Sequence, residues 1–337
     1  MRKLIILFLI FYCSIGFSTP TFRIMFYNVE NYFDTIDDPE RNDNDFLPDG
    51  KKHWTSSKME EKKNSIARVI ATVGEGTPPA IVGLCEVEND YVLKLLTRYS
   101  PIKKWKYNFV HYESPDSRGI DVALLYDKTQ FELISSKCIP IIFSKGRSTR
   151  DILYVSGKTN NGILLHVFVT HAPSRIGGKN NSEPRRVAVM SMIKQHCDSI
   201  LAVNSNANIV IMGDFNDTPE DKSIRVTLGA KPLVEPFCND SLYNMLYSFV
   251  GNPYIGTHKH QSQWSVLDQI IVSGNLLNTG MLNPNSAYIF RADFLLEEDK
   301  RNMNVRPKRT YNGLRYQEGY SDHLPVVIKL ETQSFIQ

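Results

Sequence analysis

The distribution of apolar and polar residues along the chain indicates a protein built mainly from strands. Short apolar runs that are rich in β-branched and aromatic residues and bounded by turn formers are typical of strands. These runs are Phe22–Tyr27, Ala80–Cys85, Tyr107–Tyr112, Ile120–Tyr126, Leu153–Ser156, Ile163–Thr170, Asn208–Met212, Leu267–Val272 and Pro325–Leu330. Between two of them, Asn160-Asn161-Gly162 predicts a hairpin turn, because Asn and Gly tolerate positive φ angles.

Helical periodicity is confined to fewer segments. Apolar residues at helical spacing predict helices over Lys58–Val73, Tyr91–Tyr99 and Pro184–Val203. Ser57 and Glu60 have the spacing of a capping box, which would start the first helix. Because hairpins are mixed with helical crossovers, we expect an α+β fold in which sheets pack together and helices lie outside.

The first residues have the pattern of an export signal. Two basic residues precede the apolar stretch Leu4–Phe11, which is too short to span a bilayer, and small residues follow up to Ser18. We expect residues 1–18 to be removed and residues 19–337 to form a single catalytic domain of an exported protein, which is periplasmic, secreted or on the outer surface. A buried first strand or an uncleaved anchor is the alternative.

Composition changes this picture little. Of the 337 residues, 42% are hydrophobic and 22% charged, which fits a globular protein and excludes extensive disorder. The net charge of +3 is compatible with a phosphorylated substrate but does not indicate one. Cys85, Cys138, Cys197 and Cys238 could form disulfides or remain buried thiols. Since no C-x-x-C spacing occurs, a thiolate zinc site is not expected.

Two polar stretches, near residues 34–57 and 280–319, interrupt the apolar pattern. We expect both to be surface insertions that could carry specificity. The second contains Arg291, Arg301, Arg306, Lys308, Arg309 and Arg315. Such a run either contacts phosphates or is merely solvated.

Acid, amide and imidazole side chains stand at the ends of several predicted strands. They are Asn28, Glu30, Glu86, His171, Asp214 and Asn216, together with Asp322 and His323 before the last strand. Asp268 lies within an apolar run, and a buried carboxylate costs several kcal/mol unless it is paired or binds a metal. A histidine is the simplest partner for Asp268. Because a packed sheet gathers its strand ends on one rim, these side chains could converge into one site.

The chemistry of this set favours phosphate-ester hydrolysis. Glu30, Glu86, Asp214, Asn216 and Asp322 offer only oxygen ligands, which favour Mg²⁺, Mn²⁺ or Ca²⁺ over zinc. Two histidines with carboxylate neighbours suit proton transfer near neutral pH. A metal, imidazoles and amides together could neutralise the charge that develops on a phosphoryl group while a water is deprotonated.

The order of these residues resembles the endonuclease/exonuclease/phosphatase superfamily, which is DNase I-like, and within it exported bacterial nuclease-like members. The motifs that carry the resemblance are Asn28-Val29-Glu30, Glu86-Val87-Glu88, Arg118–Asp121, Thr170-His171, Gly213-Asp214-Phe215-Asn216, Asp268 and Ser321-Asp322-His323. They span most of the chain, from Phe22 to Leu330. The resemblance implies two packed, mainly antiparallel sheets flanked by helices in a four-layer α/β/β/α sandwich, with the site at one sheet edge.

The resemblance also implies roles for individual residues. Glu86 would bind the metal, with help from Glu30 and Asp322. Asn28 would hold the site together, and Asp214 and Asn216 would position the nucleophile and contact the phosphate. His323, oriented by Asp268, would be the general base or would polarise the phosphate. His171 would protonate the leaving oxygen.

Other polar residues are assigned less directly. Arg118 and Asp121 could line the substrate site or could form a structural ion pair. Arg175 is a further candidate for substrate binding. The remaining histidines, which lack a motif, are expected to be non-catalytic: His53, His111, His166, His196, His258 and His260.

These features predict a monomeric enzyme that hydrolyses phosphate esters with Mg²⁺, or with Mn²⁺ or Ca²⁺. An exported endonuclease that cleaves DNA or RNA is the first interpretation, and no protein partner is implied. One alternative is a phosphatase or lipid phosphodiesterase that acts on inositol phosphates or sphingomyelin-like head groups. The segment Ser265–Gln269 departs from the inositol 5-phosphatase signature. Another alternative is a non-catalytic binding protein on the same fold, which the complete set of acids and histidines disfavours.

Overall fold

Two six-stranded sheets form the centre of the computed structural model, which describes residues 21–143 and 148–331. The predicted export segment lies outside these residues. The first sheet has the order β13 (Tyr288–Ile289), β18 (Val326–Glu331), β1 (Thr21–Tyr32), β2 (Ile81–Val87), β4 (Asp121–Tyr126) and β3 (Asn108–His111). The second has the order β5 (Phe131–Ile139), β6 (Ile152–Thr159), β7 (Leu164–His171), β8 (Asn208–Asp214), β12 (Asp268–Ser273) and β9 (Leu242–Asn244).

The two sheets are mainly antiparallel, as predicted. The β1–β2 and β7–β8 pairs are parallel, and the other pairs of both sheets are antiparallel. The turn at residues 160–162 joins β6 and β7 in the predicted hairpin. Pairing of β1 with β18 places Thr21 opposite Glu331, so both ends of the described chain lie on neighbouring strands.

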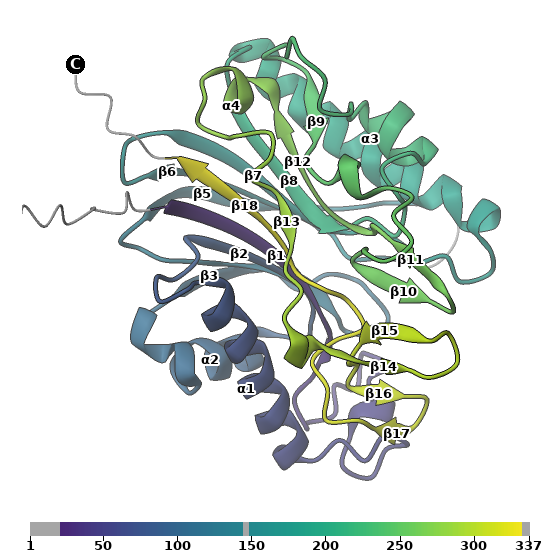
Figure 1. The fold of residues 1–337 in the computed structure, drawn as a ribbon. Helices are drawn as coiled ribbons and strands as arrows, with labels where there is room; N and C mark the ends of the chain where they lie inside the picture. Colours follow the sequence, from purple (N-terminus) through teal and green to yellow (C-terminus); the bar gives the residue numbers. More distant parts are fainter. Residues whose placement is uncertain (1–20, 144–147, 332–337) are drawn as a thin grey trace, which may run out of the picture.

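Helices cover the outer faces of the sandwich (Figure 1). The helices α1 (Ser56–Val73) and α2 (Asp90–Arg98) lie beside the first sheet, and α3 (Lys179–Val203) lies beside the second. Shorter helical turns are η1 (Asn44–Phe46), η2 (Pro101–Trp105), η3 (Ser223–Leu228), η4 (Tyr247–Phe249), η5 (Asp293–Leu295) and α4 (Gly274–Asn278). The predicted α+β four-layer sandwich is therefore confirmed. No helix in the described part of the chain is long and apolar enough to cross a membrane.

The core follows from the alternation of side chains along strands. In β8, Val210 and Met212 face the first sheet, whereas Ile209 and Ile211 pack in a second cluster with residues of α3. Both faces of β8 are thus buried, which explains its continuous apolar sequence. Gly83 of β2 faces Met212, and a Cβ at Gly83 would lie 2.8 Å from Met212 Cε. The two sheets are therefore in close contact at this point.

Two helix starts differ from the sequence prediction. The side chain of Thr55, rather than Ser57, caps α1 by accepting a hydrogen bond from Lys58 N. The predicted capping box is therefore wrong. Helix α3 begins at Lys179, ahead of the predicted start at Pro184. The buried Arg186 supports this additional turn by donating to Lys179 O and Ser182 Oγ.

Small hairpins extend the fold on one side of the sandwich (Figure 1). They are β10 (His258–His260) with β11 (Gln263–Ser265), β14 (Leu296–Asp299) with β15 (Asn304–Pro307), and β16 (Tyr311–Asn312) with β17 (Arg315–Tyr316). All of them lie outside the strands that the sequence predicts.

The two insertions are not free surface loops, because they pack against each other. Trp54 is fully buried and Tyr311 is 4% exposed. The hydroxyl of Tyr311 donates to Lys52 O at 2.9 Å, and the Lys52 ammonium lies 4.4 Å from the centre of the Tyr311 ring. Together the insertions form one wall beside the ends of β1 and β2.

Cys85, Cys138, Cys197 and Cys238 are free thiols, and the described residues contain no disulfide. Cys138 donates from Sγ to Asp151 Oδ2.

Candidate active site

The expected polar residues of the two sheets meet at one rim of the sandwich. Asp214 ends β8, where it lies opposite His171 of β7 and opposite Asp268 of β12. Asn28 of the first sheet reaches across, because its Nδ2 donates to Asp214 Oδ2 at 3.1 Å. Glu86 completes the contact between the sheets, with its Oε1 3.9 Å from His171 Nε2.

The backbone is strained where it presents these groups. Glu30, Glu86 and Asn216 have φ angles of 52°, 62° and 51°, in the left-handed region that residues with a side chain rarely adopt. The register of β1 and β2 also shifts at these points, between Asn28 and Tyr32 and between Cys85 and Val87. Such strain is concentrated at functional sites, where the surrounding structure maintains it.

Asp214 is the centre of the hydrogen-bond network. Its Oδ1 accepts from Asn216 N at 2.9 Å, and its Oδ2 lies 3.5 Å from His171 Nε2 and 3.9 Å from His323 Nε2. Burial raises the pKa of Asp214 to about 6, although the neighbouring His323 opposes this shift. Asp214 is therefore mainly a carboxylate at neutral pH.

His323 has the partner that the buried Asp268 requires. Its Nδ1 lies 2.7 Å from Asp268 Oδ2, and Asp268 is fully buried. Thr257 Oγ1 accepts hydrogen bonds from the backbone of Leu267 and Asp268 and so fixes the end of β12. Burial alone would lower the pKa of His323, but Asp268 and Asp214 outweigh it and raise that pKa well above its usual value. His323 is thus an imidazolium at neutral pH.

His171 has the opposite electrostatic environment. Burial, with further contributions from Arg150 and Arg118, lowers its pKa well below the usual value. Its Nδ1 has no hydrogen-bond partner within residues 21–143 and 148–331. The ring is therefore neutral. It can donate a hydrogen bond from Nε2, but it is not the protonated imidazolium that would be needed to transfer a proton to the leaving oxygen.

The Glu86 carboxylate offers an oxygen ligand to a hard divalent cation, but within the described residues it belongs to no group of three candidate ligands that lie within 4.8 Å of one another. Asn31 N donates to Glu86 Oε2 at 3.0 Å, which orients the carboxylate and leaves Oε1 facing His171. Oxygen ligands of this kind are those that Mg²⁺ prefers. The ligand atoms of Asp214, Asp268 and His323 lie within 4.8 Å of one another and form one candidate group for a metal ion.

Glu30 and Asp322 have protein partners of their own. Glu30 Oε2 accepts from Thr310 N at 2.6 Å and its Oε1 from Arg309 Nε at 3.3 Å, while Arg309 Nη2 donates to Asp322 Oδ2 at 2.8 Å. Burial and the neighbouring Asp322 raise the pKa of Glu30 to about 7. Both oxygens of Glu30 are therefore bound to residues of the second insertion, and its role as a metal ligand remains a prediction.

Arg118, Asp121 and Arg175 lie in different environments. Arg118 pairs with Asp116 at 3.5 Å and is 45% exposed, so it does not form the considered structural pair with Asp121. Asp121 is buried, accepts from Ser114 N at 3.1 Å, and lies 3.4 Å from His111 Nε2. Its surroundings fit a structural role.

Arg175 borders the site through the backbone. Its Nε donates to Asn216 O at 2.7 Å, and its Nη2 pairs with Asp221 at 2.8 Å. Arg175 thus helps to hold the loop that carries Asn216.

Lys62 and His258 are site residues that the sequence prediction missed, and Arg309, which was expected only as one member of a basic run, also reaches the site. The fully buried Lys62 donates to Thr310 Oγ1 at 2.5 Å and to Tyr320 O at 2.6 Å, and burial lowers its pKa to about 8. The His258 ring packs 4.7 Å from the ring of His323. Lys62 could have been found, because it falls on the apolar face of α1, whereas His258 and Arg309 lie in segments without a periodic pattern.

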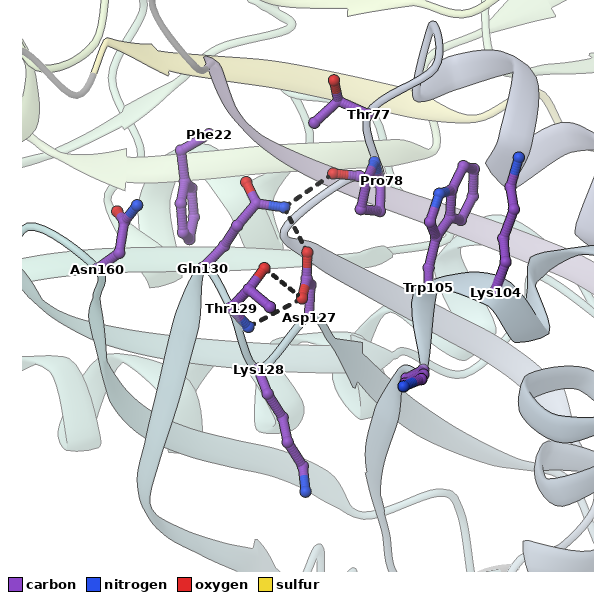
Figure 2. A pocket seen from close by; sticks show the side chains of 11 residues that line it. Phe22, Thr77, Pro78, Lys104, Trp105, Asp127, Lys128, Thr129, Gln130 and Asn160 are labelled. Carbon is purple, nitrogen blue, oxygen red and sulfur yellow. Dashed lines mark hydrogen bonds between the residues drawn. The ribbon is translucent and has the colours of Figure 1, made fainter.

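A separate cavity of about 600 Å³ lies at the opposite end of the first sheet, near the start of β1 (Figure 2). Phe22, Trp105 and Gln130 are among its lining residues. Gln130 Nε2 donates to Pro78 O and to Asp127 Oδ2, so these polar groups bond to one another. This cavity contains none of the predicted site residues.

A sandwich with this rim of carboxylates, amides and histidines defines a DNase I-like protein, in the class of metal-dependent phosphodiesterases, nucleases and phosphatases. The model of the Endonuclease/Exonuclease/phosphatase family matches residues 23–332, and the chain belongs to this family. The family uses divalent metals, and its members are hydrolytic phosphoesterases. No curated protein matches the sequence.

Solved structures agree with this fold. The human Nocturnin catalytic domain with bound sulfate anion is 18% identical, with a TM-score of 0.54 and coverage of 93% of this chain and 94% of that chain. An endonuclease/exonuclease/phosphatase family protein from Bacteroides thetaiotaomicron is 17% identical, with a TM-score of 0.56 and coverage of 92% and 95%. Truncated TDP2 from Caenorhabditis elegans is 16% identical, with a TM-score of 0.55 and coverage of 93% and 98%.

Proposed function

We propose that the protein is an exported, Mg²⁺-dependent phosphodiesterase that cleaves nucleic acid. The observation that carries the proposal is the position of Asp214, which accepts a hydrogen bond from Asn28 and lies 3.5 Å from His171, beside Glu86 and the His323–Asp268 pair. These residues combine a carboxylate that can bind a metal ion with groups that can deprotonate a water molecule and stabilise the negative charge on the phosphoryl group in the transition state.

Glu86 would hold the cation, and the groups around it fit that role. A bound divalent ion would neutralise part of the negative charge on a phosphoryl oxygen. The rest of the chemistry belongs to side chains of the chain itself. Asn31 N keeps the Glu86 carboxylate oriented.

Asp214 is the residue best placed to accept the proton of an attacking water. Its pKa of about 6 keeps it charged at neutral pH and close to the optimum for a general base. Asn28 Nδ2 and Asn216 N hold the two carboxylate oxygens, so that the base has a fixed orientation.

His323 and His171 then stabilise the transferred group. Because Nδ1 of the His323 imidazolium is bonded to Asp268, its Nε2–H is available to a phosphate oxygen. The neutral His171 donates a weaker hydrogen bond from the opposite side of Asp214. Removing one such stabilising donor raises a barrier by about 3–4 kcal/mol, or roughly 10²–10³ in rate.

A basic pocket beside the site supports a substrate with more than one phosphate. This pocket of about 200 Å³ is lined by four basic residues, Lys259, Arg301, Arg306 and Arg309, and by two acids, Asp299 and Asp322, so its lining keeps a net positive charge. Phosphates that flank the scissile one would be attracted there. A structural neighbour, TDP2 from D. rerio, is known in complex with a single strand DNA product, which adds support.

A substrate panel tests the proposal. Purified protein is incubated with plasmid DNA, single-stranded DNA, RNA, bis-p-nitrophenyl phosphate, p-nitrophenyl phosphate, inositol phosphates and sphingomyelin, each with Mg²⁺, Mn²⁺, Ca²⁺ or EDTA. We expect metal-dependent cleavage of nucleic acid that weakens steeply as salt increases. Turnover of monoesters or lipids alone would refute the nuclease, and undiminished turnover in EDTA would refute the metal role.

Export is tested separately by fractionation. We expect the expressed full chain to lose residues 1–18 and to be recovered outside the cytoplasm, which N-terminal sequencing of the purified protein would show. Recovery of the uncleaved chain in the cytoplasmic fraction would contradict this part of the proposal.

A further inference from the structure

We propose that His258, Asp322 and His323 form a second metal site, selective for a transition-metal dication such as Zn²⁺, and that occupation of this site inhibits the enzyme. One ligand atom from each of the three residues lies within 4.8 Å of the other two. His258 comes from the small β10–β11 hairpin and has no role in the proposed catalysis.

The backbone holds the two histidines beside each other. His258 and His323 are partners in an antiparallel β-bridge, and Leu324 N donates to Thr257 O at 2.7 Å in the same pairing. The two rings therefore leave neighbouring chain segments on the same side, with their centres 4.7 Å apart and their planes inclined at 39°. The pair does not depend on a flexible loop to bring the nitrogens together.

Two of the three ligands are already oriented by partners outside the site. Asp268 binds Nδ1 of His323 at 2.7 Å, and Arg309 binds Oδ2 of Asp322 at 2.8 Å. The atoms left over, His323 Nε2 and Asp322 Oδ1, face each other at 3.9 Å. A carboxylate on the far nitrogen of a metal-binding histidine is the usual outer support of such sites.

The ligand types distinguish this site from the one at Glu86. Two imidazole nitrogens with one carboxylate suit Zn²⁺, Cu²⁺ or Ni²⁺, whereas oxygen ligands alone suit Mg²⁺. Zinc bonds of about 2.0–2.1 Å separate ligand atoms in a tetrahedral site by roughly 3.3 Å, so small side-chain rotations would close the group. His258 and Asp322 are partly exposed, which gives an ion access.

Inhibition follows from the atom that the ion would occupy, and this part rests on the proposed function. His323 Nε2 is the atom that the proposed mechanism directs at the phosphate. An ion on this nitrogen would displace its proton, so the hydrogen bond to the phosphate would be lost, and the ion would also bind Asp322, which lines the basic pocket.

Binding is tested without turnover. The Zn²⁺ affinity of the purified protein is measured in excess Mg²⁺ by competition with a chromophoric chelator, and Co²⁺ is used as a probe whose visible absorption reports low coordination number. His258→Gln keeps the size and neutrality of the side chain, and His258→Ala serves as a second variant. His260→Ala, at an exposed histidine of the same strand, is the matched control. We expect both His258 variants to lose at least about 10-fold in Zn²⁺ affinity and the control to keep it.

Inhibition is then measured relative to the uninhibited rate of each variant. We expect micromolar Zn²⁺ to inhibit the parent and His260→Ala, and the inhibitory concentration to rise at least about 10-fold in His258→Gln. Equal Zn²⁺ affinity in the parent and both folded His258 variants would overturn the site, and bound Zn²⁺ that leaves the rate unchanged would overturn the inhibition. A protein without phosphodiesterase activity would refute the proposed function alone, because the affinity measurement does not need turnover.

Discussion

Replacement of Asp268 by Asn isolates the charge that this residue places behind His323. The substitution keeps the size of the side chain, and Asp268 Oδ1 has no hydrogen-bond partner among the described residues. The new amide group can occupy the Oδ1 position while its oxygen keeps the 2.7 Å contact with His323 Nδ1, at a cost in stability of about 1–3 kcal/mol because the amide would be buried without an acceptor. We expect the fold to be retained.

The expected loss of rate follows from the strength of that contact. A hydrogen bond to a charged group contributes about 1.5–3 kcal/mol, which corresponds to roughly 10- to 150-fold in rate if it is required in the transition state. Since Asp268 does not reach the substrate, kcat should fall by this factor while KM changes little.

The pH profile gives a second readout. Burial lowers the pKa of His323, whereas the charges of Asp268 and Asp214 raise it. Removal of the Asp268 charge should therefore lower that pKa. If the imidazolium is the active form, activity falls as the pH rises through its pKa. The alkaline limb of the profile should then move to lower pH in Asp268→Asn.

The assay is steady-state cleavage of the best substrate from the panel between pH 5 and 10, with thermal unfolding as the control for folding. An unchanged kcat and an unchanged alkaline limb in a variant that is folded at the assay temperature would refute the role of Asp268. A large loss of kcat without any shift of the limb would refute the assignment of a charged His323.

Further changes should separate catalytic effects from structural ones. Glu86→Gln should lower Mg²⁺-supported turnover by at least roughly 10², because one carboxylate charge is lost from the metal side, with an unchanged circular dichroism spectrum. Gly213→Ala should destabilise the protein by about 1–3 kcal/mol and should also reduce its activity, because the added Cβ would lie 2.2 Å from Thr170 O. Urea unfolding measures the loss of stability, and the cleavage rate measures the loss of activity. Arg186→Met should cost about 1.5–3 kcal/mol in urea unfolding, because the fully buried Asp217 loses its 2.7 Å partner and keeps only Arg175 and Ser223.

Each of these variants has an outcome that would contradict the reasoning. Full Mg²⁺-dependent activity in Glu86→Gln would exclude Glu86 as the metal ligand. Parental stability in Gly213→Ala would mean that β7 and β8 can move apart at little cost in free energy. Lys194→Ala is the control for Arg186→Met, since the Lys194–Asp198 pair of the same helix is exposed. We expect it to change stability by about 0.5 kcal/mol or less. Similar effects of the two substitutions would argue against the importance of burial.

The sequence predicts the central strands and the residues at their ends because these features leave a local pattern. An apolar run that stops at Glu86, His171 or Asp214 is visible without any knowledge of tertiary structure. The cost of burying a carboxylate predicts that Asp268 needs a partner, for which a histidine is the simplest choice, and the resemblance identified that histidine as His323. Which strands are neighbours, and hence which residues touch, depends on contacts between distant segments, and the resemblance to a known family supplied that information.

Features that the sequence did not predict have identifiable causes. Strand β5 is an edge strand in which exposed and half-buried side chains follow one another irregularly, so it lacks the alternation of a half-buried strand. His258 reaches the site from the short β10–β11 hairpin, and Arg309 reaches it from the connection between β15 and β16, so the position of each is set by tertiary packing. Helix α3 starts before Pro184 because Arg186 holds its first turn, a contact that overrides the preference of proline for the beginning of a helix.

The division of the site between the two sheets has a consequence for how the protein responds to changes far from the rim. Asn28 and Glu86 move with the first sheet, whereas His171, Asp214 and Asp268 move with the second, so the spacing of the sheets sets the distances between these two groups. Interior substitutions that widen or narrow this spacing, for example at the contact of Gly83 with Met212, would alter catalysis while every polar group remained in place. Catalytic rate would thus serve as a sensitive measure of sheet separation.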